Sequence, residues 1–276
     1  MMTYLDYIQQ NAERIATYHQ EPFTIEELYV GKINALRAIG DVFFQYRVDE
    51  LSGVPLTREF VKESFKRSSY TGYVATMLWG GLGLPNWRHL VKAMTIVKPE
   101  VECKINNLQS LLKRDQIQEA FMSLQISRDR QYPQNNKFAG VGISYFTKLL
   151  YFLYDGESPV PPLIFDKWGT FIHAGILISQ KETDRLNTFY KMGYDKSGRF
   201  YISIKSNQST GYRYAVYADY LQRMSALSLE NHLLPPDKLE EFLFGKDLRN
   251  TENKNNNNPR YFVFNFVKDY YDRLST

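Results

Sequence analysis

Two stretches decide the fold: Phe138-Ala-Gly-Val-Gly-Ile-Ser-Tyr-Phe-Thr-Lys-Leu-Leu-Tyr-Phe-Leu153 and Pro161-Pro-Leu-Ile-Phe-Asp-Lys-Trp168. The first predicts a tight Gly-Val-Gly turn that leads directly into an apolar helix. Gly140 and Gly142 can take backbone angles closed to other residues, and they expose amide groups with no side chain in the way. Because the N-terminus of a helix attracts anions, a phosphate of a nucleic acid is a candidate ligand of this turn.

The second stretch places an acid where a new helix should begin. Asp166 follows a Pro-Pro pair, and proline is favoured at helix starts. In the plain interpretation, Asp166 caps the helix that carries Trp168 and Phe171. In the functional interpretation, it is a carboxylate placed about one short helix after a turn that binds phosphate. The two interpretations are compatible.

This arrangement resembles the helix-hairpin-helix core of DNA glycosylases, in particular the 8-oxoguanine DNA glycosylase branch and its bacterial OGG-fold relatives. In that family, a hydrophobic-x-Gly-hydrophobic-Gly hairpin is followed by a helix, a short loop and an Asp that opens the next helix. Phe138, Gly140, Val141 and Gly142 match the hairpin, and Asp166 matches the acid. A Gly-x-Gly motif alone is a weak signal, but the hairpin, the helix and the delayed Asp together are more specific.

The resemblance implies an all-α fold and an enzyme that flips a base out of duplex DNA. It implies that Gly140, Val141, Gly142 and Ser144 contact the DNA backbone and that Asp166 is the catalytic acid. It also suggests a pocket for the flipped base, for which the aromatic residues beside the acid, Phe165 and Trp168, are the candidates.

One position departs from the family pattern. Bifunctional members carry a lysine that forms a Schiff base two residues after the second hairpin glycine, and this chain has Ser144 there. The nearest lysine is Lys148, which lies one turn later on the same helix face as Ser144. A lysine on a polar face is usually only solvated. Either Lys148 acts as an amine nucleophile from a shifted position, or the protein lacks lyase chemistry, and the sequence leaves both open.

Composition excludes several other classes of site. The chain has 276 residues, a formal net charge of +4 and one cysteine, Cys103. One cysteine excludes an intrachain disulfide and a four-cysteine iron–sulfur cluster. The four histidines have no metal-ligand spacing, so we expect no metal and no cofactor. The aromatic content of 15% fits either core packing or surfaces that stack on bases.

The sequence shows neither a signal peptide nor a membrane span, and this predicts the cellular location. The N-terminal residues show no basic segment followed by an apolar run, and no stretch approaches the length of a membrane span. We therefore expect an intracellular, cytoplasmic protein with no membrane partner, associated with the nucleoid when it binds double-stranded DNA.

Helical patterns dominate the chain, with almost no alternation of period two. The sequence predicts one glycosylase-like helical unit over residues 1–276, with the hairpin at 138–153; a C-terminal subdomain at 181–276 is left open. One strand-like run occurs near residues 198–205, so at most a short β-arm is expected. Helices are predicted at 3–18, 24–48, from Thr57, 70–79, from Asn86, 99–113, 115–126, 181–195, 212–227 and from Pro235, and residues 260–274 are interpreted as a helix or as a strand followed by a helix.

Three functions are consistent with the sequence. The first is a DNA glycosylase that removes a damaged or modified base, with oxidised guanine as the first guess. The second is a non-catalytic helix-hairpin-helix DNA-binding protein, for example in bacterial defence against foreign DNA, and Ser144 motivates it. The third is a helical adaptor in which the Gly-Val-Gly turn is only a tight loop.

Overall fold

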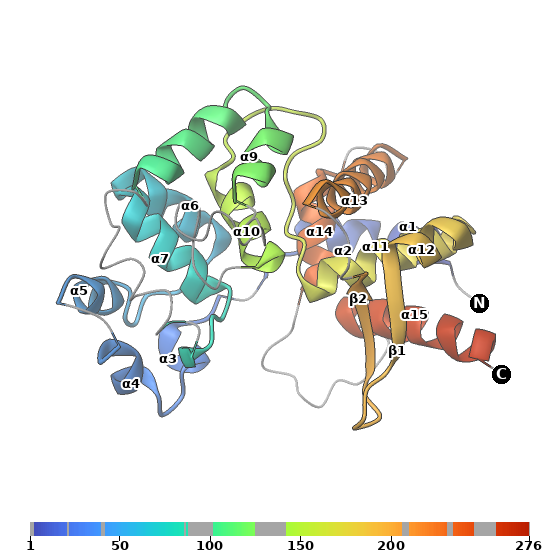
Figure 1. Cartoon of the computed structure of the whole chain (residues 1–276), viewed down its shortest axis with the longest axis horizontal. Coiled ribbons are helices and arrows are strands. Elements are labelled where there is room, and N and C mark those ends of the chain that lie inside the picture. Colours follow the sequence, from blue (N-terminus) through green and yellow to red (C-terminus); the bar gives the residue numbers. More distant parts are fainter. Residues whose placement is uncertain are drawn as a thin grey trace, which may run out of the picture. The chain divides into compact units, whose positions relative to one another are not determined.

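The computed structural model describes both stretches quoted above from Gly142 onward. The described residues are 3–20, 22–39, 42–85, 87, 102–124, 142–205, 210–230, 234–245 and 258–275. Phe138, Gly140 and Val141 of the predicted hairpin, and the helix start predicted at Asn86, lie outside these ranges. Figure 1 shows the helices and strands in chain order.

The chain divides into two compact units. Unit 1 comprises residues 1–21 and 159–276, and unit 2 comprises residues 22–158. That both units act as one glycosylase-like whole stays a prediction from the sequence.

Unit 2 is built around a buried helix, α7. Its residues from Tyr70 to Trp79 are all buried, and α6 and α10 pack against it. Residues 102–112 are also helical. The labelled helices of this unit are α3 (Ile25–Leu28), α4 (Ile33–Arg37), α5 (Val42–Glu50), α6 (Arg58–Arg67), α7 (Ser69–Trp79), α9 (Ile117–Leu124) and α10 (Ile143–Leu153).

Local capping fixes the α6–α7 hairpin. Thr57 accepts a hydrogen bond from the Phe60 amide at the start of α6, as its sequence predicted, and Ser68 accepts one from the Thr71 amide at the start of α7. Gly72 then lets the two helices approach closely, because a Cβ atom there would lie only 2.2 Å from the ring of Phe65.

A buried arginine ties α10 to this hairpin. The guanidinium carbon of Arg58 lies 5.6 Å from the centroid of the Trp79 ring and 4.9 Å from that of Tyr151. Lys62 adds a second cation 4.7 Å from the Tyr151 ring. These cation–π contacts join α6 and α7 to α10, the helix that carries Lys148.

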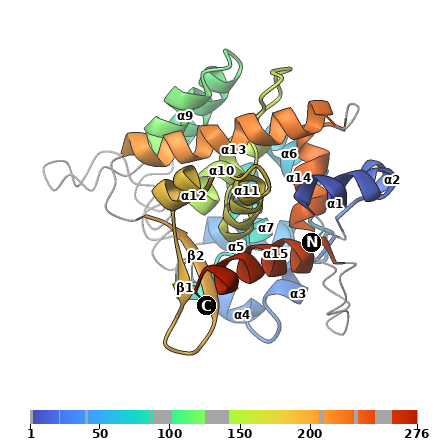
Figure 2. The same ribbon diagram turned by 90° about the vertical axis from the view of Figure 1, so that its right-hand side faces the viewer.

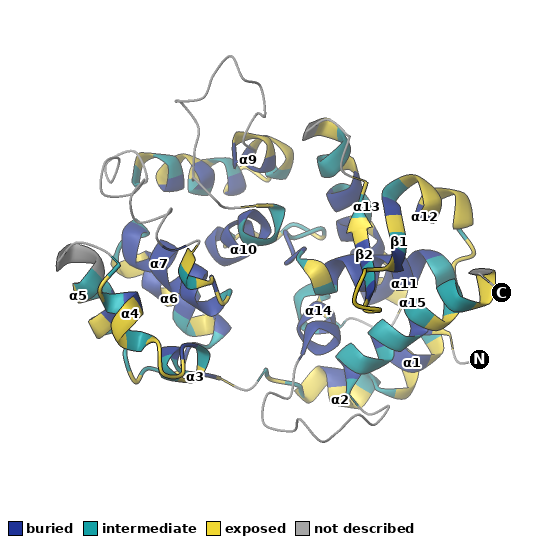
Figure 3. Ribbon diagram, turned by 60° about the horizontal axis from the view of Figure 1, so that its bottom comes forward, coloured by how far each residue is buried: buried dark blue, intermediate teal, exposed yellow. Residues whose placement is uncertain are grey.

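Unit 1 is built around α11 (Lys167–Ser179), whose residues from Gly169 to Leu177 are all buried. Figure 2 looks nearly along α11, with α13 above it and α15 below it, and Figure 3 shows its buried surface in dark blue. The other helices of the unit are α1 (Tyr4–Gln10), α2 (Ala12–Thr17), α12 (Thr183–Phe189), α13 (Thr210–Glu230), α14 (Pro236–Phe244) and α15 (Pro259–Ser275).

A two-stranded hairpin completes unit 1. Strands β1 (Tyr190–Tyr194) and β2 (Phe200–Ile204) pair antiparallel, with Tyr190 opposite Ile204 and Tyr194 opposite Phe200. The short β-arm predicted near 198–205 is confirmed. The helix predicted over 181–195 is wrong in its second half, because residues 190–194 pair with β2 across a short turn and form β1 instead of continuing α12.

The prediction of a mainly α-helical fold is confirmed, although two of the long helices are divided. The helix predicted over 3–18 breaks at Asn11, where α1 ends and α2 begins. The helix predicted over 24–48 is three short helices, and Gly31 between the first two has a left-handed φ of 67°. None of the helices in the described ranges has the length and apolarity needed to cross a membrane.

A buried ionic network lies between α11, α13 and the hairpin. His173 is fully buried, and its Nε2 lies 2.8 Å from Oδ2 of Asp219, while its Nδ1 lies 2.6 Å from the Tyr190 hydroxyl. A neutral imidazole with its proton on Nε2 satisfies both neighbours, since the tyrosine then donates to Nδ1. Arg223 and Arg185 also donate to Asp219, at 2.8 and 3.1 Å.

This network should make the stability of the protein depend on pH. Burial lowers the pKa of His173 below its usual 6.5, so the unfolded chain takes up that proton first as the pH falls. Burial alone would raise the pKa of Asp219, but hydrogen bonds from His173 and Arg223 outweigh it and lower the pKa from 3.8 to about 2. The stabilisation from Asp219, on the order of 2 kcal/mol, is present above its unfolded pKa and is lost toward pH 2.

We therefore predict that the free energy of unfolding falls as the pH drops from 7 to 5, because His173 must be protonated in the unfolded state. In a His173→Gln variant this loss should be smaller, while the exposed His19→Gln control should behave as the wild type. Chemical denaturation at each pH measures the effect. An unchanged pH slope in His173→Gln would contradict the assignment.

Candidate functional site

The described part of the predicted hairpin is Gly142, the N-cap residue of α10. Gly142 is exposed, and no side chain caps the helix. Its backbone angles, φ −91° and ψ −177°, are ordinary extended values, so Gly142 does not use the backbone angles that are closed to other residues. A Cβ atom at Gly142 would meet nothing within 4 Å. The N-cap residue thus offers no side chain to the first amides of α10, and helix N-termini attract anions such as phosphate.

Lys148 is buried, with 3% of its surface exposed, and not solvated as a lysine on a polar helix face usually is. Its Nζ lies 3.3 Å from both the backbone oxygen and the hydroxyl of Ser144. Helical side chains lean toward the N-terminus, and here that lean carries the amine back by one turn. The amine of Lys148 therefore sits beside the residue that occupies the family's lysine position.

Neighbouring residues of unit 2 keep Lys148 in this conformation. Its Nζ lies 5.4 Å from the centroid of the Tyr145 ring. The Tyr145 hydroxyl donates to the carbonyl of Gly80 at 3.3 Å. A Cβ atom on Gly80 would lie 2.8 Å from the Tyr145 ring and 3.2 Å from Cδ of Lys148. The end of α7 thus forms a wall against which the lysine packs.

Asp166 is the N-cap residue of α11, as the sequence predicted. Its Oδ1 accepts hydrogen bonds from the amides of Trp168 at 2.7 Å and Gly169 at 3.4 Å. Its backbone oxygen accepts from both the amide and the hydroxyl of Thr170, each at 2.9 Å. The carboxylate is half-buried and held in one orientation at the positive end of the helix.

The turn before Asp166 packs tightly on α11. A Cβ atom on Gly169 would lie 2.9 Å from the carbonyl oxygen of Ile164 and 3.1 Å from the ring of Phe165. Phe165 is only 1% exposed, and its ring centroid lies 4.9 Å from that of Tyr220. Phe165 is thus part of the core of unit 1, and its place in a base pocket stays a prediction.

Trp168 has a neighbour that the sequence did not indicate. The guanidinium carbon of Arg260, in the first turn of α15, lies 4.5 Å from the Trp168 ring centroid. Arg260 also donates two hydrogen bonds to the Phe244 carbonyl, at 3.0 and 2.6 Å. Burial lowers the pKa of Arg260 to about 10, against the opposing effect of the Asp166 charge. A cation and an aromatic ring therefore lie beside Asp166. The sequence pattern could not predict this pair, because Trp168 and Arg260 are far apart in the chain.

The predicted site residues thus fall into two sets. Unit 2 brings together Gly142, Ser144 and Lys148 on α10, and unit 1 brings together Asp166 and Trp168 on α11. Within the ranges that the structure describes, no cluster of three His, Cys, Asp or Glu residues is placed to hold a metal ion.

Comparison with protein families identifies the class. Residues 54–244 of the 276 match the family described as "Putative 8-oxoguanine DNA glycosylase OGG-like protein". The matched region contains the two helices that carry Lys148 and Asp166, and the chain belongs to this family. No match was found among curated proteins or among solved structures. Membership indicates a glycosylase-related function with DNA as the substrate.

The N-terminus of α10 gives a direct test of phosphate binding. A Gly142→Asp substitution caps the helix and suits its dipole, so stability should stay equal or rise by a few tenths of a kcal/mol. The added carboxylate should nevertheless repel the DNA phosphate and weaken duplex binding by about tenfold. Gly142→Ser, which caps without charge, should lose less. Fluorescence anisotropy and thermal unfolding measure both effects, and wild-type affinity in Gly142→Asp would exclude a phosphate here.

Proposed function

We propose that this protein is a DNA glycosylase that excises a damaged or modified base after flipping it out of the duplex, with an 8-oxoguanine-like base as the first candidate substrate. The observation that carries the proposal is the position of the Lys148 amine, 3.3 Å from the Ser144 hydroxyl. In the resembled family the catalytic lysine occupies the position of Ser144, and here an amine from one turn further along lies beside that residue.

Binding would begin at the DNA backbone. The start of α10 at Gly142, together with Gly140 and Val141, would contact phosphates through backbone amides, with Ser144 nearby. A base inside a duplex is out of reach of any side chain, so it must be turned out of the stack. Trp168, braced by Arg260, offers an aromatic face on which the flipped base can stack.

Cleavage would then use the acid and the amine. As the bond between sugar C1′ and the base nitrogen breaks, its electron pair leaves with the base, and positive charge develops on the sugar. The Asp166 carboxylate would stabilise that charge. Nζ of Lys148, acting as the neutral amine, would form the new bond to C1′ as the base departs and takes up a proton, and the nitrogen would then lose a proton. The C1′–O4′ bond of the sugar would break next, with its electron pair and a proton going to O4′, and the nitrogen lone pair would form the C=N bond of the Schiff base. Elimination of the 3′ phosphate from that Schiff base would give lyase activity.

The burial of Lys148 supports a chemical role over a solvated one. The side chain is 3% exposed and packs against Gly80 and Tyr145, so its amine is held in one place, as a positioned nucleophile must be. The orientation of Asp166 supports its role in stabilising the charge on the sugar, since hydrogen bonds from two backbone amides fix the carboxylate. Family membership independently indicates DNA as the substrate.

Base release from a duplex that carries 8-oxoguanine opposite cytosine tests the proposal. We expect Asp166→Asn to lower the single-turnover rate by roughly 100- to 1,000-fold, because the asparagine keeps the cap but removes the charge. Lys148→Ala should abolish strand scission. Lys113→Ala, an exposed lysine of the same unit, is the matched control and should keep wild-type activity.

A relocation variant separates a chemical from a structural role of Lys148. Adding Ser144→Lys to Lys148→Ala returns the amine to the family's position, and strand scission should recover in part. If the wild type binds duplex DNA tightly but releases no base from any modified substrate, the protein is a non-catalytic DNA-binding protein. That function is favoured by Ser144 at the family's lysine position.

A further inference from the structure

Unit 2 contains a pocket separate from Lys148 and Gly142, with a cavity volume of about 480 Å³. This volume lies within the range of roughly 300–1,000 Å³ that is usual for small-molecule sites. The residues around it come from the segment between α3 and α4 and from the loop after α7. They include Leu28, Tyr29, Lys32, Gly81, Gly83 and Leu84.

Tyr29 forms a fixed aromatic wall of this pocket. It is 6% exposed, and its hydroxyl donates to the Leu82 carbonyl at 2.5 Å and accepts from the indole nitrogen of Trp87 at 2.8 Å. Burial raises the pKa of Tyr29, partly offset by the hydrogen bond from Trp87, so the phenol stays neutral. The ring therefore offers a rigid, uncharged surface.

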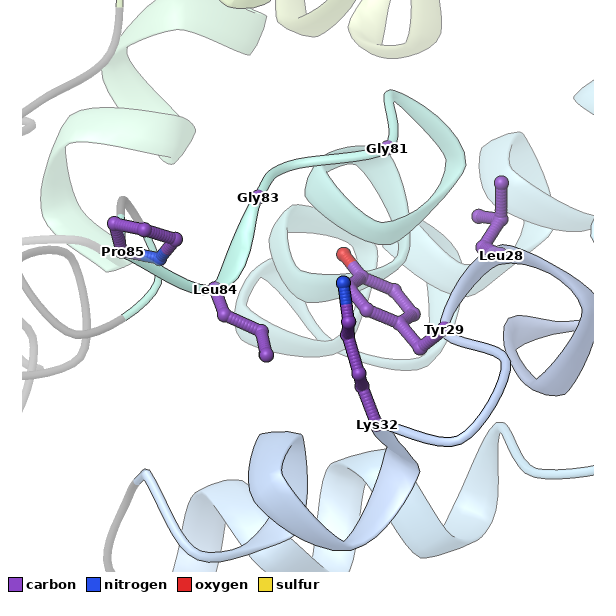
Figure 4. Close-up of a pocket in the computed structure, with 7 residues that line it drawn as sticks. All are labelled: Leu28, Tyr29, Lys32, Gly81, Gly83, Leu84 and Pro85. Carbon is purple, nitrogen blue, oxygen red and sulfur yellow. The ribbon is translucent and has the colours of Figure 1, made fainter.

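Lys32 supplies the charge. Figure 4 shows its side chain extending along Tyr29 toward the loop of Gly81 and Gly83. Lys32 is exposed, and within the described ranges no ion pair with an acid holds it. It is the single charged residue among the described residues around the cavity. The pocket thus pairs an apolar wall with one cation.

Gly81 and Gly83 add no side chains to their part of the pocket wall. Gly81 has a left-handed φ of 66°, and a Cβ atom there would meet nothing within 4 Å. A Cβ atom on Gly83 would approach only Cδ of Pro85, at 3.8 Å. A Cβ atom at position 83, which lines the pocket, would therefore make only an ordinary van der Waals contact.

The pocket adjoins the helix that carries Lys148. Gly80, which contacts both Tyr145 and Lys148, directly precedes Gly81 in the wall. DNA bound at the start of α10 would consequently pass close to the pocket.

We propose that this pocket binds one nucleotide of the DNA strand, with the base against Tyr29 and Leu84 and the phosphate on Lys32. A base needs a flat apolar surface, and its phosphate needs a cation at the edge of that surface. The inference rests on the proposed DNA substrate, and it adds a second contact outside the Lys148 and Asp166 sites.

Fluorescence anisotropy of the full chain with a labelled 8-oxoguanine duplex, across a salt series, tests the proposal. Lys32→Gln should weaken binding roughly three- to tenfold and reduce the slope of log affinity against log salt by about one unit. Gly83→Val should fill the pocket and weaken binding to a similar extent. Both variants should unfold at the wild-type temperature, which would show that the loss of affinity is not a loss of folding. Lys113→Gln is the matched charge control and should change neither affinity nor slope.

The outcomes separate this proposal from the glycosylase proposal. If the wild type binds and cleaves while Lys32→Gln and Gly83→Val bind equally well, the pocket proposal is overturned and the glycosylase proposal stands. If a free deoxynucleoside monophosphate binds the wild type more tightly than the duplex does, and Lys32→Gln abolishes that binding, the pocket serves free nucleotides and the proposal is overturned. If the wild type binds no DNA, both proposals fall.

Discussion

A missing side chain at Gly80 sets the geometry on which the Lys148 site depends. Without a Cβ atom there, the ring of Tyr145 and the stem of Lys148 can pack directly against the end of α7. The lysine is buried there, and its amine extends back along α10 to Ser144. The position of a candidate nucleophile thus follows from close approach of two helices.

The acid is positioned by a different principle. α11 is buried along most of its length, so its first turn cannot shift without disturbing the core of unit 1. Asp166 caps that turn, and the tight contact of Gly169 with the Ile164 carbonyl fixes the approach of the preceding segment. The network around His173 then secures the same helix two turns further on.

What the sequence could predict here was local. The start of α11 at Asp166 and the capped start of α6 at Thr57 follow from neighbouring residues, and both were predicted correctly. The stacking of Arg260 on Trp168 was not predictable, because it joins residues distant in the chain. Strand β1 was missed although its partner β2 follows directly, because residues 190–194 lack the strand-like pattern of 200–204. Periodicity placed Lys148 on a polar face but could not reveal that Gly80 and Tyr145 would cover it.

The position of the Lys148 amine is the central claim, and borohydride trapping followed by peptide mass spectrometry tests it most directly. The wild type would be reduced on a duplex with 8-oxoguanine opposite cytosine, digested and analysed for the DNA-linked residue. The account predicts a covalent adduct on Lys148. An adduct on another amine, such as exposed Lys167 beside Asp166, or base release with no adduct at all, would contradict it.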